Sequence, residues 1–259
     1  GKVGKILDKA KELGFDTIGL ADYNGMYGIM EFYSKAKKMD IKALCGIELT
    51  LTTVLAKTPS QYQYVTLLAK NYQGYLHLMK LTTIANTVGN GGLATIDIAT
   101  LKEHADGIIC ILGGQRSLLA SQLDDLKTGE SFDKLIEESI KPFQEIFGED
   151  FYLEITAQDY KLETHLELSN EQIMKISLQT KIPCTITSNF HYINKDDKIA
   201  YETALAIKDQ KQIRDSTRRR VAGNYHIMSD QEVRDIMKGN GFDDKTIDEL
   251  FENNQIVAD

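Results

Sequence analysis

The sequence contains no tryptophan, only three prolines and only three cysteines among its 259 residues. The cysteines, Cys45, Cys110 and Cys184, each stand alone in an apolar stretch without CxxC spacing. An odd number of isolated cysteines argues against both a disulfide framework and a cysteine-ligated zinc site. We therefore interpret the three thiols as buried packing groups.

Long apolar runs and an excess of positive charge are also missing. No apolar stretch approaches the roughly 20 residues that a membrane-spanning helix requires, and residues 1–14 form an amphipathic helical pattern instead of the apolar core of a signal peptide. We expect a cytoplasmic protein without a membrane partner. The net charge of −8 argues against a simple nucleic-acid-binding module, because such domains are usually basic.

Strand-like and helix-like patterns alternate along residues 1–209, which we interpret as an α/β domain. The expected strands cover residues 17–21, 43–51, 62–69, 107–112, 151–156 and 182–187. The expected helices cover residues 1–14, 29–36, 75–85, 96–104, 117–126, 132–147 and 162–179, with a kink or break at Pro142. This alternation predicts a largely parallel sheet covered by helices, either open and doubly wound or closed into a barrel. Neither GxGxxG nor GxxxxGK[ST] occurs, which disfavours the nucleotide-binding sheets.

Residues 210–259 differ in pattern and are interpreted as a C-terminal helical extension. A helix over 200–209 leads into a basic run, a short strand is expected at 224–228, and the S-x-x-E sequence from Ser229 to Glu232 predicts a helix start. Gly239 should end that helix, and a last helix should begin near Asp244. The basic run supplies possible phosphate contacts at Arg214, Arg218, Arg219 and Arg220. Such a run is more commonly a solvated surface or a set of partners for nearby acids.

Candidate site residues stand at or just after three of the expected strands. They are Asp22, Glu48, Asn189 and His191. The carboxyl ends of parallel strands meet at one edge of a sheet, where carboxylates and imidazoles could hold zinc, manganese or iron. Each residue also has a plainer interpretation: Asp22 as a turn or helix cap, Glu48 as a solvent-facing carboxylate, and His191 as a packing residue. From the residues alone, this site is weakly supported.

Four segments in collinear order resemble one known family. Residues 9–51 contain LADYNGMYGIMEFYSKAKKMDIKALCGIE, residues 64–81 read YVTLLAKNYQGYLHLMKL, residues 182–197 read IPCTITSNFHYINKDD, and residues 218–233 read RRRVAGNYHIMSDQEV. These stretches resemble the PHP (polymerase and histidinol phosphatase) domain of bacterial replicative DNA polymerase III α subunits that lack an inserted exonuclease. The resemblance implies a distorted (β/α)7 barrel, and its first strand, with a His-x-His pair, would precede Gly1.

The resemblance also implies a metal site from which several ligands are missing. Glu48 and His191 match family ligand positions, and Asp22 matches the aspartate of the family's TDHG sequence. Tyr23 and Tyr64 stand where histidines are expected. Asn189 replaces a carboxylate, and Gly114 falls near a cysteine or histidine position. A phenol is a poor substitute for a neutral imidazole, because it gives up its proton only well above neutral pH. We therefore expect a vestigial site without a metal cluster, and only Glu48 and His191 as ligands if any metal binds.

By this resemblance, the chain is expected to be a structural and interaction domain of a DNA-directed DNA polymerase, a nucleotidyltransferase. The implied partners are the polymerase palm and thumb of the same polypeptide, with a proofreading exonuclease or other replisome subunits beside them, and DNA through the parent protein. The magnesium that serves catalysis would lie in the palm, so this segment is expected to need no cofactor and to be non-catalytic. The alternative is a metal-dependent phosphoesterase or a 3′-5′ proofreading exonuclease.

Overall fold

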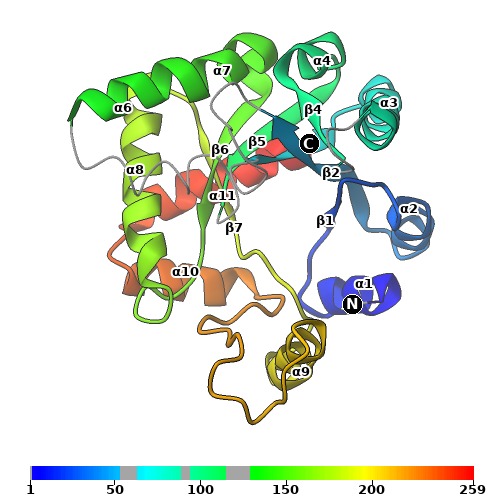
Figure 1. Ribbon diagram of the computed structural model, residues 1–259, viewed down its shortest axis with the longest axis vertical. Helices are drawn as coiled ribbons and strands as arrows, with labels where there is room; N and C mark the ends of the chain where they lie inside the picture. Colours follow the sequence, from blue (N-terminus) through cyan, green and yellow to red (C-terminus); the bar gives the residue numbers. More distant parts are fainter. Residues whose placement is uncertain (1, 53–62, 89–93, 115–128) are drawn as a thin grey trace.

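The computed structural model describes residues 2–52, 63–88, 94–114 and 129–259. Seven strands form one curled sheet, in the order β1-β2-β3-β5-β6-β7, with the short β4 beside β2 (Figure 1). The strands are β1 (Thr17–Tyr23), β2 (Lys42–Thr52), β3 (Gln63–Ala69), β4 (Ile96–Asp97), β5 (Ile108–Gly113), β6 (Phe151–Thr156) and β7 (Cys184–Thr187). No pairing joins β1 to β7 within these residues, so the sheet is a half-barrel. The expected α/β class is confirmed.

Strand direction differs in part from the expected largely parallel sheet. The pairs β1–β2, β2–β4, β5–β6 and β6–β7 are parallel, but β3 runs antiparallel to both of its neighbours, β2 and β5. The sheet is thus largely parallel, as expected, and β3 is the exception because only about ten residues separate the predicted strands 43–51 and 62–69. A parallel return within one sheet requires a crossover of a dozen residues or more.

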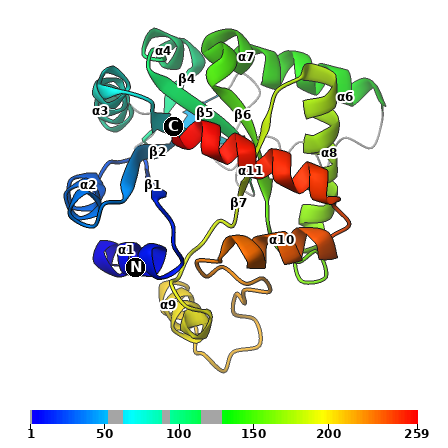
Figure 2. The ribbon, with the colours of Figure 1, turned by 180° about the vertical axis from the view of Figure 1, so that it is seen from behind.

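Helices cover the outer face of the sheet, and α11 lies across its inner face (Figures 1 and 2). The helices are α1 (Val3–Glu12), α2 (Ile29–Lys38), α3 (Tyr72–Val88), α4 (Ile98–Glu103), α6 (Gly129–Leu135), α7 (Lys141–Phe147), α8 (Thr164–Thr180), α9 (Lys198–Lys208), α10 (Asp230–Gly239) and α11 (Asp244–Ala258). The expected helix at 117–126 lies outside the described residues. None of the described helices is long and apolar enough to cross a membrane.

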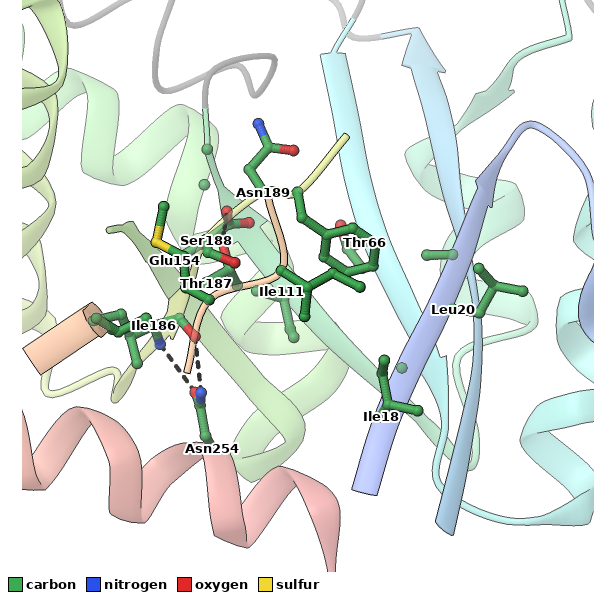
Figure 3. A pocket seen from close by; sticks show the side chains of 18 of the residues that line it. Ile18, Leu20, Thr66, Ile111, Glu154, Ile186, Thr187, Ser188, Asn189 and Asn254 are labelled. Carbon is green, nitrogen blue, oxygen red and sulfur yellow. Dashed lines mark hydrogen bonds between the residues drawn. The ribbon is translucent and has the colours of Figure 1, made fainter. Parts of the chain in front are cut away.

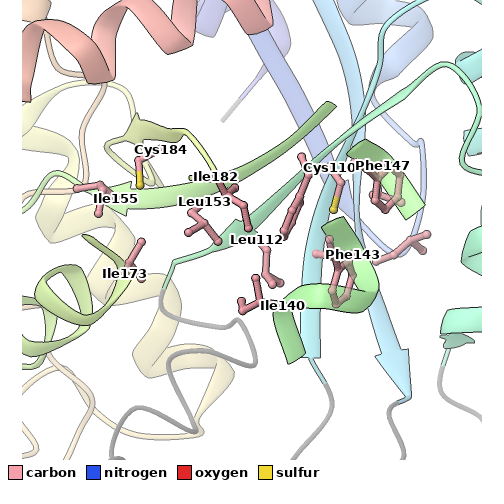
Figure 4. Close-up of a cluster of buried hydrophobic side chains, with 14 of the residues drawn as sticks. Cys110, Leu112, Ile140, Phe143, Phe147, Leu153, Ile155, Ile173, Ile182 and Cys184 are labelled. Carbon is pink, nitrogen blue, oxygen red and sulfur yellow. The ribbon is translucent and has the colours of Figure 1, made fainter. Parts of the chain in front are cut away.

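The main core lies between the sheet and its outer helices. Side chains from β5, β6 and β7 pack there against α7 and α8 (Figure 4). Cys110 and Cys184 belong to this core, being 0% and 4% exposed, which confirms the interpretation of these two thiols. Burial raises the pKa of both thiols, to about 11 for Cys184. Cys45 is a half-buried free thiol on β2.

The helical stretch around Pro142 is continuous, and it changes helix type just before the proline. A π-helical turn over Ile136–Ile140 lies between α6 and α7, and Pro142 stands in the first turn of α7. A proline is tolerated in a first turn because its missing N–H would have no intrahelical partner there. The predicted break is therefore not formed, and Ile140 and Phe143, on either side of the proline, both enter the core.

The C-terminal residues pack into the same core as the rest of the chain. Ser229 and Glu232 form the predicted capping box at the start of α10, which ends at Gly239, and α11 begins at Asp244. The strand expected at 224–228 is not formed. That segment makes isolated backbone bonds to residues 191–193, such as from Ile227 N to Ile193 O at 3.2 Å, because no ladder continues on either side.

Candidate functional site

A cavity of about 510 Å³ opens on the inner face of the half-barrel (Figure 3). Every long strand contributes to its wall, and α10 and α11 close one end. Its polar wall residues include Tyr23, Glu48, Tyr64, Thr66, Glu154, Thr187, Ser188, Asn189 and Asn254. Side chains from β1 and from β7, the two outermost strands of the sheet, therefore line the same cavity, because the sheet is curled.

Asp22 holds a turn instead of facing the cavity. Its Oδ2 accepts a hydrogen bond from the backbone N–H of Gly28 at 2.8 Å. The next residues are fixed by Asn24, which adopts a φ of +49° and bonds through its side chain to both the N–H and the hydroxyl of Thr50. Asparagine tolerates the left-handed region better than most residues. The carboxylate of Asp22 is thus used by the turn between β1 and α2.

Tyr23, Glu48 and Tyr64 come together on neighbouring strands. Tyr23 lies opposite Glu48 in the β1–β2 register, and the Tyr23 and Tyr64 rings meet edge to face with centroids 5.9 Å apart. All three line the cavity. Two phenols and one carboxylate offer hydrogen bonds and an aromatic surface, but no imidazole.

His191 is positioned by aromatic packing. Its ring stacks on Tyr201 with centroids 5.3 Å apart and an interplanar angle of 9°, and it lies 5.2 Å from the Tyr225 ring. Its backbone N–H donates to the carbonyl of Tyr225 at 2.8 Å. His191 is not among the described residues that line the cavity, whereas Asn189, held at a φ of +48°, is one of them.

Glu154 on β6 is a cavity residue that sequence reasoning missed. Its Oε1 accepts a hydrogen bond from the Thr187 hydroxyl at 2.6 Å, and its side chain packs against Gly113 and Gly114. Withdrawal from water raises the pKa of this carboxyl, and hydrogen bonds from Thr187 and Thr156 oppose that rise. A glutamate inside the apolar run FYLEIT carries the same signal that singled out Glu48, an ionisable group in a buried strand.

The basic run is divided between paired and exposed arginines. Arg218 is 8% exposed and donates to Glu202 at 2.8 Å and to the carbonyl of Ile213. Arg219 makes two bonds of 2.6 Å to Asp209. Burial alone would raise the pKa of Glu202, but the bonds from Arg218 and Val221 lower it overall. Arg214 and Arg220 are exposed.

The open edge of β7 is closed by α11. The Asn254 side chain accepts from the backbone N–H of Ile186 at 2.9 Å and donates to its carbonyl at 2.8 Å (Figure 3). Asn253 donates to the carbonyl of Cys184 at 2.8 Å. These amides replace the ladder bonds of a neighbouring strand and so cover an edge that could otherwise pair with another chain.

One protein family matches this chain. Residues 1–158 match the PHP domain family. The DNA polymerase III α subunits of Borreliella burgdorferi and Helicobacter pylori are each 30% identical to this chain; the alignments cover all of the chain but 22% and 21% of those proteins. The chain thus spans about a fifth of the length of these curated relatives. Among solved structures, an amidohydrolase from Chromobacterium violaceum with bound sulfate has a TM-score of 0.45 at 10% identity, over 73% of this chain and 82% of that one.

Proposed function

The chain belongs to the PHP domain family, and from that premise we propose that it is a structural and interaction domain of a DNA polymerase III α subunit. The observation that carries this proposal is the match of the whole chain to one region, about a fifth in length, of α subunits from Borreliella burgdorferi and Helicobacter pylori, with 83% of the chain matched in that of Bacillus subtilis. In this proposal the polymerase chemistry, with its magnesium, resides elsewhere in the longer polypeptide.

The cavity side chains support a non-hydrolytic role. A metal cluster requires several imidazoles and carboxylates aimed at one point. Of the residues that match the family's site, Glu48 lines the cavity, whereas Asp22 caps a turn and His191 stacks on tyrosine rings. Within the described residues, no three His, Cys, Asp or Glu side chains are grouped so that they could hold an ion. The residues present therefore do not fit the cluster, and we derive no hydrolytic step from them.

A metal-binding measurement tests the non-hydrolytic part of the proposal. The purified protein should bind neither zinc, manganese nor iron in stoichiometric amount, as measured by plasma mass spectrometry after dialysis against each ion. It should also release no p-nitrophenol from p-nitrophenyl phosphate or its diester. Stoichiometric metal together with hydrolysis that disappears in Glu48→Gln would establish the phosphoesterase or exonuclease alternative instead.

The structural role is tested in the longer polypeptide. Deleting residues 1–259 should lower both the thermal stability and the polymerase activity of the whole α subunit. The effects on stability of one substitution in this domain and one in the palm should be non-additive when the two residues are in contact. In a double-mutant cycle, contacting residues show an interaction free energy. Full polymerase activity and unchanged stability after the deletion would refute the role. The proposed partners are accordingly the palm and thumb of the same polypeptide, with a proofreading exonuclease or other replisome subunits as further candidates.

A further inference from the structure

Helix α3 has few charges for a helix at a protein surface. Its 17 residues include one charged side chain, Lys80. Tyr72 is 74% exposed and Met79 is 39% exposed, while Leu78 and Leu81 on the opposite side are buried in the core. The exposed side of α3 thus combines two large apolar side chains, Tyr72 and Met79, with uncharged polar residues and Lys80. Large apolar side chains grouped at a surface commonly mark an interaction site.

A groove of about 400 Å³ runs between α3 and α2 on the outside of the sheet. Its walls are Ile29, Met30, Tyr33, Asn71, Tyr72 and Tyr75, and its floor is formed by Ala43, Cys45 and Ala69. None of these nine residues is charged. Met30 is 68% exposed and Tyr33 49%.

Aromatic contacts preform the wall of this groove. The rings of Tyr72 and Tyr75 stack with centroids 6.3 Å apart, and the Tyr75 hydroxyl lies 3.8 Å from the Met30 sulfur. The two helices are thereby connected across the groove. A preformed apolar groove needs little ordering when it is filled, which favours binding.

A second hollow of about 390 Å³ follows the outer side of α3. It is lined by Gln73, Leu76, Met79, Lys80, Thr83 and Ile84. We call the groove and this hollow together the α2–α3 face. Its fifteen lining residues include no carboxylate, although the chain has 38 acidic residues. Interfaces that are permanent are more apolar than those that form transiently, so the composition of the α2–α3 face favours a permanent cover.

The C-terminal residue lies next to this face. A third hollow shares Tyr33 and Ala43 with the groove. Its other walls are largely charged and include Asp16, Lys37, Asp40, Lys42 and Asp259. The Lys42 ammonium donates to the Asp259 carbonyl at 3.0 Å, and both overall views place the C-terminus beside β2 (Figures 1 and 2). The relatives are about five times as long as this chain. In a longer polypeptide of this kind, residues after Asp259 would start at the edge of the groove.

We infer that the α2–α3 face is the surface on which a later part of the same polypeptide packs. The inference rests on the proposed function and specifies where the structural role is exerted. A permanent cover from within one polypeptide explains why the groove is uncharged and largely apolar, why the whole face contains no carboxylate, and why it lies next to Asp259. It also accounts for the sparing use of charge along α3.

Methionine oxidation in the intact α subunit tests this inference without altering the protein. Met30 and Met79 are exposed in this chain, whereas Met237 is fully buried. In the whole polypeptide, hydrogen peroxide should oxidise Met30 and Met79 at least about fivefold more slowly than free N-acetylmethionine amide, because a packed segment shields the thioether. Peptide mass spectrometry after timed quenching measures each rate, and Met237 reports any unfolding.

A pair of matched variants shows whether the protection comes from packing on this face. Tyr72→Glu should restore fast oxidation of Met30, whereas Leu178→Glu, at an equally exposed position on α8 (77% exposed), should leave it slow. Fast oxidation of Met30 in the unaltered polypeptide would overturn the inference. So would protection that appears only at high protein concentration, which would indicate a second copy, or only after another subunit is added. None of these results would refute the structural role itself, which is tested separately by deleting residues 1–259 and by the paired substitutions in the palm.

Discussion

Glu154 is the cavity residue whose charge state should depend most clearly on the fold. Its carboxyl is withdrawn from water, bonded to the Thr187 hydroxyl and close to the backbone of Gly113 and Gly114. The raised pKa means that the folded protein favours the neutral form. Stability associated with this group is therefore present below its ordinary pKa and is lost as the pH rises through the raised value.

We predict that Glu154→Gln stabilises the protein at pH 8 relative to the unaltered chain and has little effect at pH 4. The amide can still accept the Thr187 hydrogen bond but never acquires a charge. Urea unfolding at both pH values measures the difference. Equal effects at the two pH values would contradict the raised pKa. Glu149→Gln, a change of the same kind at an exposed carboxylate, is the control.

Arg218 and Arg214 should differ sharply although both belong to the basic run. Arg218 holds Glu202 and two backbone carbonyls while almost fully buried, so Arg218→Ala should lower the free energy of unfolding by about 1–3 kcal/mol. Arg214→Ala, at an exposed position, should change it by less than about 0.5 kcal/mol. Urea denaturation compares the two, and equal effects would contradict the buried pairing. Phosphate binding by the exposed Arg214 and Arg220 stays a prediction.

At the scale of single elements, the position of α3 is set by a close approach to the turn before β5. A Cβ on Gly74 would lie 1.7 Å from the carbonyl oxygen of Gly107. The backbone N–H of Gly74 also donates a hydrogen bond to Oδ1 of Asn71 at 3.0 Å, which fixes the start of the helix. The helix can approach the sheet this closely only with glycine at position 74.

Alanine substitution at two helical glycines should therefore act in opposite directions. Gly74→Ala should destabilise the protein by about 3 kcal/mol, the upper end of the usual cost of overpacking, because α3 must move outward. Gly239→Ala, with no atom within 4 Å of the new methyl group, should be neutral or stabilising by about 0.5–1 kcal/mol, since alanine restricts the unfolded chain. Thermal and urea unfolding test both, and a tolerated Gly74→Ala would refute this packing account.

The sequence predicted well which segments are helices and which are strands. It predicted less well the direction of a strand and whether a strand-like segment finds a partner strand. The capping box at Ser229 and the strands around Cys110 and Cys184 follow from local patterns, because caps and apolar runs act within a few residues. Strand pattern contains no information on direction, which is why β3 was expected in a largely parallel sheet. The segment at 224–228 has strand-like residues but no neighbouring ladder to join.

At the scale of the whole molecule, α11 joins the end of the chain to the middle of the sheet. Ile247 and Leu250 belong to the main core, and the Asn254 amide replaces a strand partner for Ile186. The division into residues 1–209 and 210–259 stays a prediction. The shared core leads us to expect one cooperative unfolding transition for both parts, to be checked by comparing calorimetric and van't Hoff enthalpies.

Asn254→Ala should lower the free energy of unfolding by about 1–3 kcal/mol, because it leaves a backbone N–H and a carbonyl of β7 without their partners. Gln255→Ala, one residue along at an exposed position, should cost less than about 0.5 kcal/mol. Denaturant midpoints measured by circular dichroism separate the two. If Asn254→Ala unfolds α11 alone and leaves the stability of the sheet unchanged, the view that this helix closes the sheet edge is contradicted.

By itself, the sequence determined the alternation of strands and helices and the family, because each depends on residue types at known spacings. That tyrosine and asparagine stand in place of metal ligands stays a prediction from the resemblance. Only the tertiary structure decided that Asp22 caps a turn, that His191 stacks on Tyr201, and that Glu154 joins Glu48 in the cavity wall. These outcomes depend on partners far away in the chain, which spacing cannot reveal. The same holds for the α2–α3 face, whose exposure is set by how two helices sit on a curled sheet.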